Sequence, residues 1–78
     1  MTKEDIQKVS AILTCNGIEH DTKNEVILIN RDSIINKISG KNENDSYTQL
    51  REILNDSFNG RFVYAGKTDE WLMLDRIS

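Results

Sequence analysis

The chain has 78 residues, with thirteen acidic and ten basic side chains for a net charge of −3, and one cysteine, Cys15. This length allows a single domain, residues 1–78, and one cysteine excludes an internal disulfide. The charges are spread without a basic block, which argues against strong sequence-independent nucleic-acid binding, because that needs clustered Lys and Arg. No apolar run approaches the roughly 20 residues that span a bilayer, so we expect a cytoplasmic protein without membrane contact.

The first predicted element is a helix over residues 2–15. Thr2 and Asp5 have the spacing of a capping box at its start, and Gly17 supplies a left-handed stop beyond its end. Its apolar residues recur at the spacing of one helix face: Ile6, Val9, Ile12 and Leu13. Both ends of this helix are therefore marked in the sequence.

The next residues predict a strand and a short helix. Residues 18–24 are polar and predict an irregular connection, whereas the apolar, β-branched run at residues 25–29 predicts a buried strand. Asn30 or Asp32 can then cap a second helix that ends at Gly40. The apolar residues of this helix are Ile34, Ile35 and Ile38.

A third helix is predicted over residues 46–58, after a charged loop at residues 41–45. Ser46 and Gln49 repeat the capping-box pattern. Asn59-Gly60 ends the helix. Its apolar residues keep helical spacing: Tyr47, Leu50, Ile53, Leu54 and Phe58.

The chain closes with a predicted β-hairpin in "GRFVYAGKTDEWLMLDRIS", residues 60–78. Apolar runs at residues 62–65 and 71–74 flank a polar turn. Side chains alternate between the faces of a strand, so Trp71 and Met73 share one face of the last strand and residues 72 and 74 share the other. Because both faces are apolar, both need cover, from within the chain or from a partner.

The order α-β-α-α-β-β predicts an α+β fold, either winged-helix-like or a three-stranded antiparallel sheet with helices on one face. The stretch "SYTQLREILNDSFNGRFVYAGKTDEWLML" resembles the recognition-helix-and-wing half of the winged-helix superfamily in its element order and hairpin. The resemblance implies that the third helix enters the DNA major groove and that the hairpin contacts the backbone. The DNA contacts implied for this chain are Gln49, Arg51, Asn55, Arg61 and Lys67.

The charge of this half of the chain weighs against DNA. Residues 41–70 contain four basic and six acidic side chains, a net charge of −2, where a DNA-binding surface should be positive. The spacer at residues 40–46 is also longer than the tight turn of a typical helix-turn-helix. Winged helices also serve protein contacts, and an acidic chain fits that use better.

No group of side chains predicts catalysis, a cofactor or a metal. A metal site needs three or four ligands, and Cys15 with His20 supplies only two. Cys15 also lies at the C-terminal end of its helix, where the dipole does not favour a thiolate. The turn Gly66-Lys67-Thr68 lacks the upstream glycine and the following helix of a phosphate-binding loop. We expect a protein that is not an enzyme.

The favoured hypothesis is a small acidic protein-binding module, such as a regulator, adaptor or inhibitor. A phage or mobile-element origin fits the proline-free, Asn- and Ile-rich composition. Its partner would be another protein or a second copy in a homodimer, because so small a core rarely supplies more than about 3–5 kcal/mol alone. The expected interface is Phe62, Tyr64, Trp71 and Met73. The alternative is a winged-helix transcriptional regulator that binds DNA.

Overall fold

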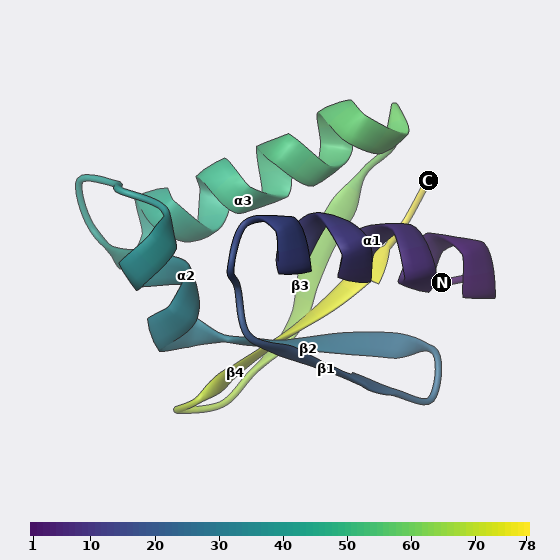
Figure 1. The fold of residues 1–78 in the computed structure, drawn as a ribbon, viewed down its shortest axis with the longest axis horizontal. Coiled ribbons are helices and arrows are strands. Elements are labelled where there is room, and N and C mark those ends of the chain that lie inside the picture. Colours follow the sequence, from purple (N-terminus) through teal and green to yellow (C-terminus); the bar gives the residue numbers. More distant parts are fainter.

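A four-stranded antiparallel sheet carries three helices on one side (Figure 1). The structure is a computed structural model that describes residues 1–78. The elements are α1 (Lys3–Cys15), β1 (His20–Lys23), β2 (Val26–Asn30), α2 (Arg31–Lys37), α3 (Glu43–Phe58), β3 (Phe62–Lys67) and β4 (Trp71–Arg76). The predicted α+β class is confirmed, and the predicted order holds with one strand added.

The sheet has the strand order β1-β2-β4-β3, and every neighbouring pair is antiparallel. The two central strands, β2 and β4, come from the middle and the end of the sequence, and they place Ile29 opposite Leu72 and Ile27 opposite Leu74. The edges of the sheet are β1 and β3.

The added strand is β1, where the sequence predicted an irregular connection. It forms a hairpin with β2 that pairs His20 with Ile29 and Lys23 with Val26. Asn24 occupies the turn with a positive φ of 57°, a conformation that Asn tolerates better than most residues. The prediction failed because three of the four side chains of β1 are exposed and polar, so they carry no apolar pattern. The sheet therefore has four strands and not the predicted three.

The predicted ends of the first two helices are largely confirmed. Thr2 and Asp5 form the capping box of α1, in which the Thr2 hydroxyl accepts from the Asp5 amide at 3.1 Å. Gly17 follows the helix with a φ of 70°. Asn30 caps α2, accepting from the Ser33 amide at 2.9 Å, but α2 already ends at Lys37 and not at residue 40.

The predicted start of the third helix is wrong. α3 begins at Glu43 and is capped by Asn42, whose side-chain oxygen accepts from the Asp45 amide at 2.9 Å. Ser46 is buried, and its hydroxyl donates to the Ile38 carbonyl at 2.9 Å. The first turn was missed because its side chains are solvated and show no apolar spacing. Ser46 thus joins α3 to the end of α2.

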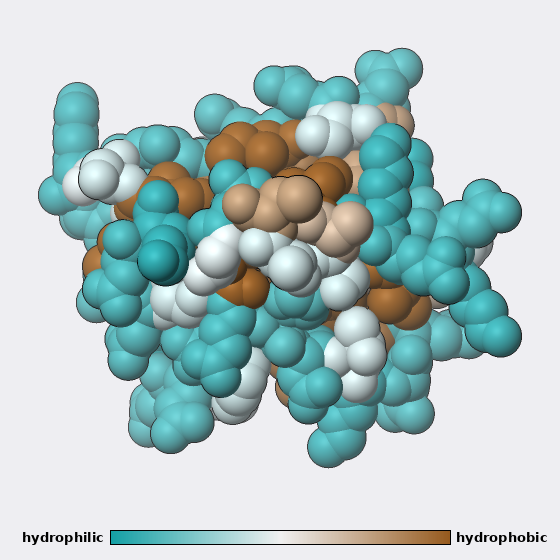
Figure 2. Space-filling view, viewed as in Figure 1, coloured by the Kyte–Doolittle hydropathy of each residue, from teal (hydrophilic) through white to brown (hydrophobic).

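The core lies between the helices and one face of the sheet. Its thirteen side chains are Val9, Leu13, Ile18, Ile27, Ile29, Ile34, Ile38, Tyr47, Leu50, Leu54, Phe62, Leu72 and Leu74. The side of the molecule seen in Figure 2, with the helices above and the sheet below, is largely hydrophilic, and its apolar residues gather mainly in the upper and middle parts. None of the helices combines the length and apolarity needed to cross a membrane.

Candidate protein-interaction surface

The sheet has an apolar second face that no helix covers. Ile27 and Ile29 of β2 and Leu72 and Leu74 of β4 point into the core, so the alternate side chains of these strands point the other way. In Figure 1 the helices all lie above the sheet. We call this second surface the open face and define it by its half-exposed apolar residues: Val26, Leu28, Val63, Trp71 and Met73.

Strand pairing brings these side chains together across three strands. Leu28 lies opposite Met73, and Met73 lies opposite Gly66 on the other side. A Cβ on Gly66 would come within 3.0 Å of the Met73 methyl carbon. The absent side chain therefore leaves room for the half-buried, flexible Met73 thioether to lie across β3.

Polar side chains lie along the β1 edge of the open face, where Asp21 and Lys23 lie opposite Leu28 and Val26. Within the face, Asp75 of the central strand β4 lies opposite Val63. Apolar surface with polar groups around it is the usual arrangement of a protein-protein interface.

Of the sequence-predicted interface residues, only Trp71 and Met73 lie on the open face. Phe62 is buried in the core with 2% exposure. Tyr64 points to the helices, and its hydroxyl donates to the Tyr47 carbonyl at 2.6 Å. Burial raises the pKa of the Tyr64 phenol, an effect that the nearby Arg51 cation opposes.

Sequence reasoning missed three members of the open face, Val26, Leu28 and Val63. The sequence did contain a signal for Val26 and Leu28, because residues 26–29 are apolar at every position and therefore on both faces of the strand, as residues 71–74 are. Such a continuous run predicts a strand that is buried on both faces, but β2 buries only alternate residues.

The sequence-predicted DNA contacts do not gather on one surface. The Gln49 amide donates to the Ser39 carbonyl and to Asp45, each at 3.2 Å. The Asn55 side-chain oxygen accepts from the Phe62 amide at 2.7 Å, which fixes the turn from α3 into β3. Arg51 and Lys67 line a hollow between α3 and β3, whereas Arg61 is exposed at the opposite end of β3.

The hairpin turn between β3 and β4 is tied to the helices by Arg31, which sequence reasoning did not single out. Its guanidinium donates to the Thr68 carbonyl at 2.8 Å and to the Tyr47 hydroxyl at 3.1 Å, and it pairs with Glu43 at 3.6 Å. The hydrogen bond with Tyr47 raises the pKa of Arg31. This turn is therefore anchored to α2 and α3.

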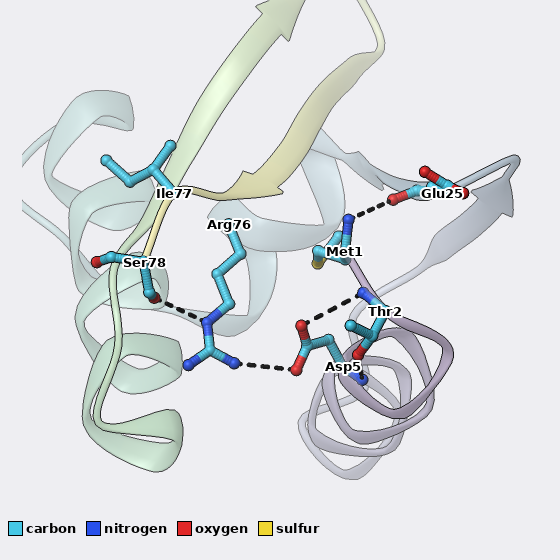
Figure 3. A pocket seen from close by; sticks show the side chains of 7 residues that line it. All are labelled: Met1, Thr2, Asp5, Glu25, Arg76, Ile77 and Ser78. Carbon is cyan, nitrogen blue, oxygen red and sulfur yellow. Dashed lines mark hydrogen bonds and ion pairs between the residues drawn. The ribbon is translucent and has the colours of Figure 1, made fainter.

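The largest hollow, about 560 Å³, lies where the two ends of the chain meet (Figure 3). Arg76 donates to Asp5 at 2.9 Å and to the Ser78 carbonyl at 2.8 Å, and its guanidinium also lies 5.3 Å from the centre of the Phe58 ring. In Figure 3 this guanidinium sits between its two oxygen partners. Arg76 and Asp5 pair with each other across this hollow, and this pair joins α1 to β4.

Cys15 and His20 lie apart from these surfaces. Cys15 is exposed at the end of α1. The His20 ring is hydrogen-bonded to the Ser10 hydroxyl at 2.7 Å and to the Ile18 carbonyl at 3.0 Å, which ties β1 to α1. The structure contains no group of three or more His, Cys, Asp or Glu residues placed to hold a metal ion.

Comparison of the chain with protein-family models, with curated proteins and with solved structures finds no match.

Proposed function

We propose that this protein is a non-enzymatic binding module whose open face contacts another protein or a second copy of the chain. The observation that supports this proposal is the row of apolar side chains on Val26, Leu28, Val63, Trp71 and Met73, which the helices leave uncovered. Monomers rarely expose contiguous apolar surface without a use for it, and Trp is enriched among the residues that dominate binding energy.

The proposed partner presents an apolar patch of its own. By occupying such a patch, the protein would act as a regulator, adaptor or inhibitor of its partner. We expect it to act in the cytoplasm, because an exposed, unpaired thiol such as that of Cys15 suits a reducing compartment. A phage or mobile-element origin remains part of this proposal on composition alone.

Charge substitutions on the open face test the proposal. We expect Leu28→Lys and Met73→Lys to abolish capture of a partner, or to dissociate a homodimer, without unfolding the protein. Ile53→Lys is the matched control, because Ile53 is 39% exposed on α3 and lies outside the open face. Affinity capture with mass spectrometry identifies the partner, sedimentation velocity measures self-association, and circular dichroism checks the fold.

The outcome that contradicts the proposal is equally specific. A folded wild-type protein that sediments as a monomer and captures nothing would remove the role of the open face. Capture that survives both open-face substitutions but fails in Ile53→Lys would move the interface to α3.

Fewer observations support the alternative proposal, a DNA-binding regulator. The amides of Gln49 and Asn55, which would read adenine, are already hydrogen-bonded within the fold. A labelled duplex that shifts at low salt, and that Arg51→Glu no longer shifts, would favour DNA binding.

A further inference from the structure

A second surface lies on the helix side of the sheet, in a hollow of about 300 Å³ between α3 and β3. We call it the α3–β3 groove. Its floor is formed by Tyr47, Tyr64 and Leu72, and its rim carries Thr48, Arg51 and Lys67. It is separate from the open face, because Tyr47 and Leu72 belong to the core side of the sheet.

The floor of the groove is fixed by contacts between its two tyrosines. Their rings meet edge to face with centres 6.3 Å apart, and the Tyr64 hydroxyl donates to the Tyr47 carbonyl at 2.6 Å. The Tyr47 hydroxyl is in turn held by Arg31 at 3.1 Å. These bonds hold α3 at a set distance from β3, so the groove is already formed without a ligand.

The rim of the groove is positive in a chain whose net charge is −3. No carboxylate lines it, and the ion pairs of the molecule involve Met1, Arg31 and Arg76 but neither Arg51 nor Lys67. Two unpaired cations next to an apolar floor form a site for a ligand that carries a carboxylate beside an apolar group.

The groove runs along an open strand edge. β3 pairs only with β4. Two backbone hydrogen bonds show which residues of β3 bond to β4: the Ile77 amide donates to the Arg61 carbonyl, and the Thr68 amide donates to the Trp71 carbonyl. Because paired residues in an antiparallel ladder alternate between bonded and non-bonded positions, the backbone groups of Tyr64 and Lys67 face away from β4. Phe62 also occupies a position that does not bond to β4, and its amide donates instead to the Asn55 side chain outside the sheet.

We propose that the α3–β3 groove binds an extended acidic peptide segment of another protein, which adds to the edge of β3 as a further strand. Main-chain bonds to Tyr64 and Lys67 align the segment, as in other cases of strand addition. Alternate side chains of an added strand point to the helix side, where an acidic residue meets Arg51 and Lys67. The register irregularity between Tyr64 and Gly66 limits regular pairing to short stretches, so the segment is short.

A peptide fits this surface better than a nucleic acid does. Phosphate backbones need many cations, whereas the groove offers two and is followed along the hairpin by Asp69 and Glu70. The outward backbone groups of β3 are used only by a ligand that itself has a strand-like backbone.

The test uses a fluorescein-labelled hexapeptide of alternating valine and glutamate, with a valine-lysine hexapeptide of the same length as its charge control. Binding is followed by fluorescence polarisation and by amide shifts in ¹⁵N-labelled full-length protein. We expect the glutamate peptide to bind and to shift the amides of Tyr64, Gly66 and Lys67. Loss of one charge-assisted contact corresponds to an affinity change of about tenfold, which we expect for Lys67→Glu and Arg51→Glu. Arg61→Glu is the matched control, because this exposed cation lies outside the groove.

Several results would overturn the inference. These are no binding at millimolar peptide, equal binding of the lysine peptide, or a loss in Arg61→Glu equal to that in Lys67→Glu. Inorganic phosphate that shifts the same amides as strongly as the peptide would mark a small-anion site and not a peptide groove. Shifts centred on Leu28 and Met73 would assign the peptide to the open face, so failure here and failure of the proposed function are distinguishable.

Discussion

The ion pair between Arg76 and Asp5 provides a quantitative test of how the fold is held together. The two side chains are 25% and 18% exposed, and their atoms lie 2.9 Å apart. The Arg76 guanidinium also lies 5.3 Å and 5.8 Å from the ring centres of Phe58 and Phe62. One side chain therefore links the start of α1, the end of α3 and the start of β3.

Replacing Arg76 with Met keeps an apolar stem over the rings but removes the charge. Exposed ion pairs contribute about 0.2–1 kcal/mol and truncated buried ones cost about 3–5 kcal/mol, so we place this partly buried pair at about 1–2 kcal/mol. Each cation-ring contact adds about 0.5–1 kcal/mol. We therefore expect Arg76→Met to lower the free energy of unfolding by about 2–4 kcal/mol.

A double-mutant cycle with Asp5→Asn separates the pair from the ring contacts. Urea unfolding followed by Trp71 fluorescence measures the four free energies, and we expect a coupling of about 1 kcal/mol that decreases in 1 M salt because exposed charges are screened. Additive losses, with a coupling below about 0.3 kcal/mol, would show that the pair contributes nothing and that the ring contacts account for the effect of Arg76.

Three further predictions concern the helix side of the sheet. Ser46→Ala leaves the Ile38 carbonyl without its 2.9 Å donor and should cost about 1–3 kcal/mol in urea unfolding; an unchanged midpoint would contradict this role. Gly40→Ala places a Cβ 2.6 Å from the Ser46 amide nitrogen, so we expect it to destabilise the protein more than Ser46→Ala does. A smaller loss of stability would show that the connection between α2 and α3 can shift to make room for the methyl group. Because the folded-state pKa of Tyr64 is raised, the unfolded state loses its proton first, and stability should fall above about pH 10 by up to about 1.4 kcal/mol per pH unit. Tyr64→Phe should remove that part of the slope, and identical slopes would refute it.

The capped and apolar elements were predictable because their signals are local. The Thr2 cap with Asp5 and the stop at Gly17 depend on neighbours within one turn. β1 and the first turn of α3 were missed, because their exposed polar side chains follow no burial pattern. The position of β1 is instead determined by pairing with a strand further along the chain, in which His20 lies opposite Ile29.

The candidate interface was only partly predictable for a related reason. The apolar pattern of the last strand predicted two apolar faces, and Trp71 and Met73 share the face away from the core. The sequence could not show that β2 lies beside β4, which adds Leu28 next to Met73. It also could not separate Phe62 from Trp71, because the assignment of a face depends on which side the helices pack.

The two edge strands of the sheet, β1 and β3, determine whether copies of the chain could join edge to edge into a fibre. Head-to-tail growth of a fibre would require β1 of one molecule to pair with β3 of the next, but β1 has only four residues, with Asp21 and Lys23 exposed. Short, charged edge strands resist such pairing, and the irregular register of β3 would interrupt the ladder after a few bonds. Neither edge of this sheet therefore offers copies of the chain a long, regular ladder along which to polymerise.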